Sequence, residues 1–188
     1  MPDLCHQFLW LDLETTGLDP RAPDARILEW ALVLADDDGP DATFEPVQEF
    51  TAAVHWPDVD ALRLRCPPRV QQMHAVNGLW RDVASPAAPV LADADAFLAA
   101  VIPGPGDRWR LAGFSVHFDL GWVRVHLPRF AARLSHQVLD ASTLAAACAT
   151  WGPGVEKGPA AHRALDDVKA SLDVARRVVA TTGWKGTK

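Results

Sequence analysis

Residues 8–20 have the sequence Phe-Leu-Trp-Leu-Asp-Leu-Glu-Thr-Thr-Gly-Leu-Asp-Pro, an apolar run that carries two carboxylates and then breaks at a glycine. Because side chains alternate between the two faces of a β-strand, Asp12 and Glu14 are expected to project from the same face. Two carboxylates this close repel each other unless a cation lies between them. Oxygen ligands on a rigid strand suit Mg²⁺ or Mn²⁺, so the segment predicts a metal site, the alternative being a strand end that is merely acidic.

The composition bounds the kind of protein. The 188 residues are 49% hydrophobic and 22% charged, which is sufficient for one compact domain with a sizeable core. We expect a single domain over residues 1–183 and a loose tail over residues 184–188. Neither a basic, apolar leader nor an apolar run of the roughly 20 residues that span a bilayer is present, so we expect a cytoplasmic protein without a membrane segment. The three cysteines lack paired spacing, which argues against a zinc site or disulfide framework.

The formal net charge of -6 concerns the choice of partner. A protein that grips long duplexes needs a stripe of Lys and Arg, which this acidic chain does not offer. A nuclease for short strands remains compatible with the charge, because carboxylates that hold metal ions add to the negative count and a short oligonucleotide needs few phosphate contacts.

Periodicity and turn residues define the expected elements. Strands are predicted over residues 7–13, 27–35, 49–55, 109–114 and 138–140, the first three as a meander with a turn at 36–40. Helices are predicted over residues 68–73, 93–102, 118–126 and 142–150, the second ending at 103–106. A Gly- and Pro-rich loop over 151–161 leads into a last helix, with an apolar stripe from Leu165 to Val179. This order predicts an α/β domain with a mixed sheet.

Two further segments carry candidate ligands. Asp119 follows a predicted strand at the opening of a helix, where its carboxylate can face the first strand. Asp140 also follows a strand, but it is expected to cap the next helix. Near the C-terminal end, His162 precedes Asp167 by five residues.

The spacing in that last segment discriminates between neighbouring side chains. Five residues on an ideal helix place two side chains roughly 140° apart, so His162 and Asp167 cannot meet at one site from a single regular helix. We therefore expect His162 in the loop before the helix. Asp167 lies nearer the apolar stripe than Asp166, which makes Asp167 the better ligand and leaves Asp166 facing water.

These residues resemble a known family. Asp12-Leu13-Glu14-Thr15-Thr16-Gly17, then Phe118-Asp119, then His162 with Asp167 resemble the DEDDh class of 3′-to-5′ exonucleases, which is DnaQ-like. The resemblance implies a ribonuclease-H-like (DEDD exonuclease) fold with a mixed five-stranded sheet flanked by helices. Within the class the chain is most similar to oligoribonuclease, in the segments Asp12 to Pro20, Ala53 to His55, His74 to Leu79 and Leu139 to Leu144.

The resemblance implies roles for five residues. Asp12, Glu14, Asp119 and Asp167 would bind two divalent ions, Mg²⁺ or Mn²⁺, and His162 would be the general base. Two divalent ions can activate a water and stabilise the leaving 3′ oxygen. An imidazole with a pKa near 6.5 can accept the proton of that water near neutral pH.

The resemblance also suggests residues that contact the substrate: Thr15, Gly17, Leu18, His55, His74, Ser115 and His136. Leu18 would pack against the terminal bases, the alternative being a loop leucine that plugs the core. His55 and His74 would line the groove or else be structural histidines. Ser115 would contact phosphate.

One departure from oligoribonuclease bears on substrate length. That family carries a tyrosine and an arginine from the partner subunit ahead of its Leu-Asp-x-Ser-Thr segment, whereas this chain has Ser135-His136-Gln137-Val138 and no tyrosine. His136 can still stack on a base. A homodimer is implied by the resemblance alone.

The sequence thus predicts a metal-dependent 3′-to-5′ exonuclease that hydrolyses short single-stranded RNA to nucleoside 5′-monophosphates. A DNA-directed exonuclease of proofreading or repair type is the alternative. A catalytically silent nucleic-acid-binding module on the same fold is a third possibility, although such a module has no need of four acids and a histidine.

Overall fold

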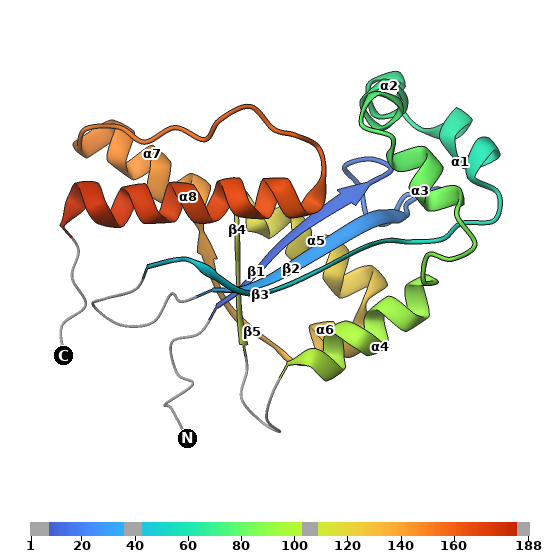
Figure 1. Ribbon diagram of the computed structural model, residues 1–188, viewed down its shortest axis with the longest axis horizontal. Coiled ribbons are helices and arrows are strands. Elements are labelled where there is room, and N and C mark those ends of the chain that lie inside the picture. Colours follow the sequence, from blue (N-terminus) through green and yellow to red (C-terminus); the bar gives the residue numbers. More distant parts are fainter. Residues whose placement is uncertain (1–7, 36–42, 103–108, 184–188) are drawn as a thin grey trace.

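The computed structural model describes residues 8–35, 43–102 and 109–183. Five strands form one mixed sheet in the order β3–β2–β1–β4–β5 (Figure 1). Their bounds are β1 (Phe8–Thr15), β2 (Ile27–Ala35), β3 (Pro46–Ala53), β4 (Trp109–Gly113) and β5 (Leu134–Asp140). The first three strands pair antiparallel, whereas β4 runs parallel to β1 and β5 parallel to β4. The predicted meander and mixed five-stranded sheet are confirmed.

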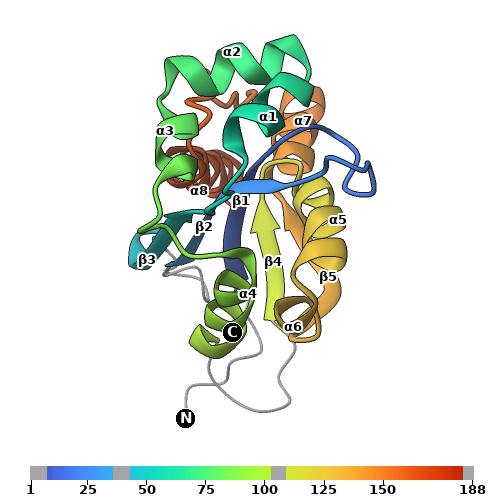
Figure 2. The same cartoon turned by 90° about the vertical axis from the view of Figure 1, so that its right-hand side faces the viewer.

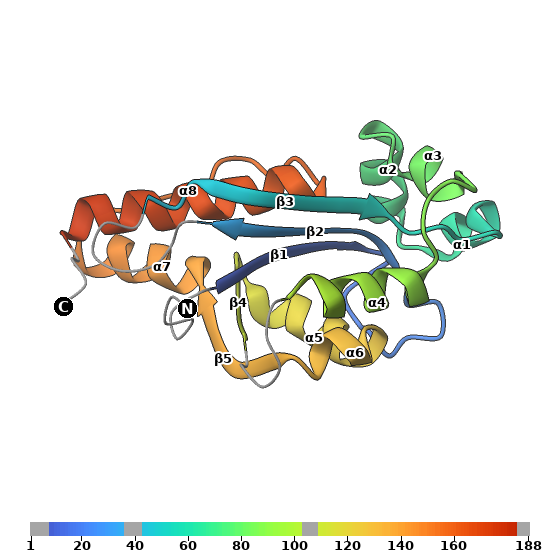
Figure 3. The same ribbon diagram turned by 60° about the horizontal axis from the view of Figure 1, so that its bottom comes forward.

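Helices cover both faces of this sheet. Their bounds are α1 (Val59–Arg65), α2 (Pro68–Val76), α3 (Leu79–Ala84), α4 (Leu91–Val101), α5 (Val116–His126), α6 (Pro128–Ala131), α7 (Ala141–Trp151) and α8 (Ala164–Thr182). Helices α7 and α8 lie on one face, and α4, α5 and α6 lie on the other (Figure 3). The short helices α1, α2 and α3 gather at one end of the sheet (Figure 2).

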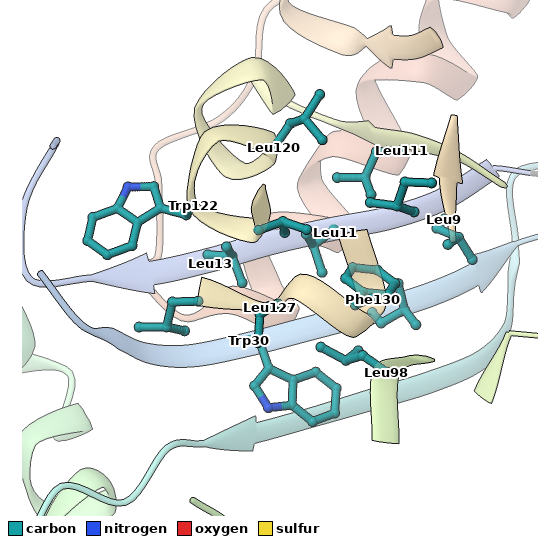
Figure 4. Close-up of a cluster of buried hydrophobic side chains, with 14 of the residues drawn as sticks. Leu9, Leu11, Leu13, Trp30, Leu98, Leu111, Leu120, Trp122, Leu127 and Phe130 are labelled. Atoms are coloured by element: carbon teal, nitrogen blue, oxygen red, sulfur yellow. The ribbon is translucent and has the colours of Figure 1, made fainter. Parts of the chain in front are cut away.

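Strand β1 is buried on both faces, as its nearly continuous apolar sequence predicts. Leu9, Leu11 and Leu13 point toward the layer of α4, α5 and α6, where they pack with residues such as Trp122 (Figure 4). Trp10, of opposite parity, packs on the other face with residues of α7 and α8. Asp12 and Glu14 share the parity of Trp10, and the sheet therefore presents both carboxylates toward α8.

Some elements differ from the prediction. Helices α1, α3 and α6 were not expected from the sequence, and β5 begins at Leu134 rather than at Val138. Helices α1 and α3 are short and pack around a small separate core that includes Leu62, Leu79 and Trp80, which local periodicity does not reveal. The other predicted elements are present with ends shifted by a few residues. The predicted turn at 36–40, the helix stop at 103–106 and the tail at 184–188 lie outside the described residues.

Two local predictions about α7 and α8 agree with the structure. Asp140 caps α7, because its carboxylate accepts a hydrogen bond from the Ser142 backbone N–H at 2.9 Å. Helix α8 buries its apolar stripe against β1, β2 and α7.

None of the helices within the described ranges is both long and apolar enough to cross a membrane.

Candidate active site

Strand β1 and helix α5 form the first wall of the site, which we call the strand wall. Glu14 is buried and Asp12 is half-buried, next to each other on one face of β1. Asp119 lies in the first turn of α5, and its Oδ1 accepts a hydrogen bond from the backbone N–H of Leu13 at 3.0 Å. This bond ties the helix that carries the third carboxylate directly to the strand that carries the other two.

The turn from β4 into α5 is crowded. A Cβ at Gly113 would lie 2.7 Å from the carbonyl oxygen of Leu11, so a side chain at this position would push β4 away from β1. Two residues later Ser115 adopts a positive φ of 60°. Backbone of this kind is uncommon for residues other than glycine and concentrates at functional sites. The glycine therefore allows α5 to start close enough for Asp119 to reach β1.

The loop before α8 and the first turn of α8 form the opposite wall, which we call the loop wall. His162 lies in the loop with a positive φ of 55°, before the helix begins at Ala164, as the five-residue spacing predicts. Its backbone N–H donates to Asp167 Oδ2 at 2.8 Å. Asp167 is buried and Asp166 is exposed, in agreement with the expectation from helical geometry.

The two walls and helix α2 line one cavity of about 530 Å³, which we call the central cavity. It contains all five residues of the predicted DEDDh set. One ligand atom from each of Glu14, His162 and Asp167 lies within 4.8 Å of the others. The complete lining is Asp12, Leu13, Glu14, Thr15, Gly17, Leu18, Pro67, Arg69, Val70, Met73, Phe114, Ser115, Phe118, Asp119, Lys157, Ala160, His162 and Asp167.

The carboxyl groups of the cavity are strongly perturbed. Burial, and after it the carboxylate of Asp12, raises the pKa of Glu14 to about 9. Burial and the charge of Asp167 raise the pKa of Asp12 to about 7. Burial is also the first cause, and Asp12 the second, of a pKa of Asp119 well above its usual range. Without cations, the cluster therefore holds protons at neutral pH.

The chemistry of this donor set fits divalent ions. Clustered carboxylate oxygens are the hard ligands that Mg²⁺ and Mn²⁺ prefer. A divalent ion offsets the mutual repulsion that otherwise keeps these groups protonated, and its binding displaces their protons. The residues that could hold it are Asp12, Glu14, Asp119 and Asp167.

A group of side chains that sequence reasoning missed anchors the loop wall. Arg163 makes a forked ion pair with the buried Glu29 of β2, with Nη2 2.7 Å from Oε1 and Nε 3.2 Å from Oε2. The other role of Glu29 is to accept the backbone N–H of Ala164, the first residue of α8, at 2.9 Å. Asn77 Nδ2 donates to the carbonyl oxygen of His162. The signal in the sequence was Glu29 itself, a charged residue in the middle of an otherwise apolar strand.

His74 lies next to Glu14 of the strand wall. Its ring on α2 is completely buried, and it packs edge-on against Trp80 with ring centroids 5.6 Å apart. Burial lowers the pKa of His74 to about 4. The ring is therefore neutral at neutral pH. Its Nε2 lies 3.6 Å from Glu14 Oε2, but the two groups do not form an ion pair under those conditions.

The substrate-binding candidates divide into two groups. Thr15, Gly17, Leu18 and Ser115 line the central cavity. His55, His74 and His136 do not line this cavity. His74 is buried, His55 Nδ1 lies 3.3 Å from the carbonyl oxygen of Val83, and His136 is exposed on the edge strand β5. Leu18 is 84% exposed at the cavity rim, so it does not plug the core.

Two further hollows adjoin the central cavity. One of about 380 Å³ lies beside α2 and shares Arg69, Met73, Ala160 and His162 with the central cavity. The other, of about 610 Å³, lies beside α7 and shares Phe114, Lys157 and Ala160. The cationic residues Arg69 and Lys157 thus lie where the central cavity opens into its neighbours, and neither was a candidate from the sequence.

The chain is similar in sequence and in fold to known proteins. No protein-family model matches the chain. It is 31% identical over 179 residues to the oligoribonuclease of Bordetella pertussis, covering 89% of this chain and 91% of that protein. It is 29% identical over 180 residues to the mitochondrial oligoribonuclease of Mus musculus, covering 90% of this chain and 70% of that protein.

Among solved structures, the chain resembles E. coli exonuclease I in complex with a dT13 oligonucleotide that carries a 5cy label, with a TM-score of 0.66 and 17% identity. The match covers 93% of this chain and 41% of exonuclease I, so the chain spans less than half the length of that protein. The predicted ribonuclease-H-like exonuclease fold is confirmed.

Proposed function

The chain belongs to the oligoribonuclease family, and we propose that it is a 3′-to-5′ exonuclease that hydrolyses short single-stranded RNA to nucleoside 5′-monophosphates. The observation that carries the proposal is the convergence of Asp12, Glu14, Asp119, His162 and Asp167 in one cavity. These residues come from β1, α5 and the start of α8, which are far apart in the sequence. A module that only binds nucleic acid has no need of this set.

In this proposal the four carboxylates hold two divalent ions, Mg²⁺ or Mn²⁺. Bound there, the ions would activate a water and stabilise the leaving 3′ oxygen. His162 would accept the proton of the attacking water, since its ring lies on the wall opposite the β1 carboxylates. The bonds from Asn77 and to Asp167 hold the backbone of His162 at both its C=O and its N–H.

The residues at the rim of the central cavity support the binding of the end of a single strand. Leu18 stands exposed at the rim, where its side chain would pack against a terminal base. Thr15 shapes the turn that carries it, because its hydroxyl donates to the carbonyl oxygen of Gly17 at 2.8 Å. Ser115, whose backbone N–H is held by Asp140 at 3.0 Å, would contact a phosphate.

The hollows beside α2 and α7 give a strand space to continue beyond the central cavity. Residues Ser135–Val138 of β5 lack the tyrosine and arginine that the family carries there. This departure and the two hollows favour RNA of roughly two to ten nucleotides over a strict dinucleotide limit. His136 is exposed on the edge strand, from which it would reach a second subunit in the proposed homodimer. We also propose that residues 1–183 act as one domain and that the enzyme works in the cytoplasm.

The test is hydrolysis of end-labelled RNA and DNA of two, five and twenty nucleotides, with Mn²⁺ and with excess EDTA. We expect stepwise release of nucleoside monophosphates, highest kcat/KM on the RNA dinucleotide or pentanucleotide, and no turnover in EDTA. A higher kcat/KM on the twenty-nucleotide DNA would replace the proposal by the DNA-directed alternative. Binding without release of monophosphates would identify a silent module.

A further inference from the structure

Lys157 is a cation inside an otherwise acidic site. It belongs to the loop between α7 and α8, and its side chain is only 14% exposed. Its Nζ lies 3.4 Å from Asp167 Oδ1 and 4.9 Å from the ring centroid of Phe114. The aliphatic part of the side chain and the cation–π contact thus keep the ammonium group at the cavity wall.

The ion pair with Asp167 conflicts with the use of that carboxylate as a metal ligand. Asp167 Oδ2 already accepts the backbone N–H of His162, so Lys157 occupies the remaining oxygen. A divalent ion bound to Asp167 would repel an ammonium group only a few ångströms away. Since lysine has a flexible four-carbon stem, Lys157 can leave Oδ1 without any change in the backbone.

Once a metal ion has displaced Lys157 from Asp167, a phosphate group of the substrate is the anion to which Lys157 can turn. Among the described residues that line the central cavity, the cationic side chains are Lys157 and Arg69, and Arg69 is exposed on α2. Lys157 also lines the hollow beside α7, so a strand that passes from one space to the other runs by its ammonium group. Charged hydrogen bonds to phosphate are among the strong ones.

We propose that Lys157 exchanges partners during the reaction cycle: it neutralises Asp167 while cations are absent and binds a phosphate of the oligonucleotide once they are bound. This inference rests on the proposed function, because it requires both a divalent ion at Asp167 and a nucleic-acid substrate. Lys157 then has two effects: it contacts the substrate, and it lowers the affinity for metal ions by competing with them for Asp167.

The experiment uses Lys157→Met, which keeps an apolar stem against Phe114 and removes the charge. Lys169→Met is the matched control, because Lys169 pairs with Glu49 at 2.8 Å and does not line the central cavity. Two quantities are measured for each protein: the affinity for Mn²⁺ alone by calorimetry, and the affinity for a labelled RNA pentanucleotide by anisotropy in Ca²⁺, with gels to show that the RNA stays intact.

The two quantities should change in opposite directions. Lys157→Met should bind Mn²⁺ several-fold more tightly, because a competing cation is gone, and should bind the RNA about tenfold more weakly. The slope of log affinity against log salt should fall in magnitude by about 0.7, the value for one phosphate contact on a single strand. Lys157→Arg should recover most of the RNA affinity, and Lys169→Met should resemble the wild type.

Unchanged RNA affinity and salt slope in Lys157→Met would show that the pair with Asp167 is only structural, and would overturn the inference. The same holds if Mn²⁺ binding weakens. Failure of the wild type to bind Mn²⁺ or RNA would instead contradict the proposed function itself, so the two failures are distinguishable. Circular dichroism and thermal unfolding verify that each variant is folded.

Discussion

The strand wall and the loop wall hold their functional groups by different means. Asp12 and Glu14 stand on a strand paired on both sides, and Asp119 is bonded to the same strand. His162 and Lys157 stand on a loop whose position depends on side chains, among them Asn77 and the pair of Arg163 with Glu29. Sheet hydrogen bonds position the first wall, whereas side-chain hydrogen bonds and ion pairs position the second.

Substitution of a carboxylate on the strand wall should cause the largest loss of kcat. Asp12→Ala should lower kcat by at least about 10³-fold, because a lost ligand costs several kcal/mol of charge stabilisation in the transition state. The metal-free variant should be at least as stable as the wild type, since one of several repelling carboxyl groups is removed. The measurements are single-turnover hydrolysis of an RNA pentanucleotide and thermal unfolding in EDTA.

Asp166→Ala is the control for this prediction. Asp166 is exposed and lies outside the central cavity, so the change in charge is the same while the site is kept. Asp166→Ala should retain nearly wild-type kcat. Comparable losses in the two variants would mean that net charge, rather than a metal ligand, is responsible.

A smaller loss is expected when the loop wall is broken. His162→Ala should lower kcat by about 10² to 10⁴-fold, the usual range for a general base, and leave Mn²⁺ affinity largely unchanged. The readout is kcat between pH 6 and 9, together with a metal titration. Wild-type kcat across this range would show that the proton goes to another acceptor.

Asn77→Asp refines the test of the loop wall. Asn77 both donates to the carbonyl oxygen of His162 and accepts the backbone N–H of Leu79 at 3.1 Å. Aspartate keeps the acceptor but not the donor, so it removes the hydrogen bond to His162 and keeps the one from Leu79, the first residue of α3. One lost hydrogen bond of about 1 kcal/mol corresponds to a loss in kcat of up to about tenfold. Asn77→Ala should show the same loss in kcat. It should also be less stable than Asn77→Asp, because it loses the hydrogen bond from Leu79 as well.

The last prediction concerns how the free energy of unfolding in EDTA depends on pH. The folded-state pKa of Glu14 is about 9 and that of Asp12 about 7, both above the usual values, so the native state binds more protons than the unfolded state at neutral pH. Stability should therefore fall as the pH rises from 6.5 to 9, by at most about 1.4 kcal/mol per pH unit for each proton. His74, with its pKa lowered to about 4, acts in the opposite direction only below pH 6.5.

Denaturant unfolding at several pH values measures this dependence. Saturating Mg²⁺ should abolish it, because the ions bind the deprotonated carboxylates. Glu14→Gln should also flatten the curve above pH 7. A metal-free protein that becomes more stable between pH 7 and 9 would contradict the described proton uptake of the strand wall.

Local sequence patterns determined the strand wall and part of the loop wall. The period of two along residues 8–15 placed Asp12 and Glu14 on one face, opposite Leu11 and Leu13. Helical geometry separated the buried Asp167 from the exposed Asp166, and the five-residue spacing placed His162 outside the helix. Each of these inferences concerns residues within a few positions of one another, where backbone geometry alone sets the side-chain directions.

Only the tertiary structure decided which distant residues join the site. Arg163 meets Glu29 across 134 positions, and Lys157 meets Phe114 only after α7 and α8 have packed on the sheet. Conversely, the exposed His136 on β5 does not line the central cavity. Such contacts follow from strand order and helix packing, and these depend on burial of the whole core rather than on the periodicity of any one segment.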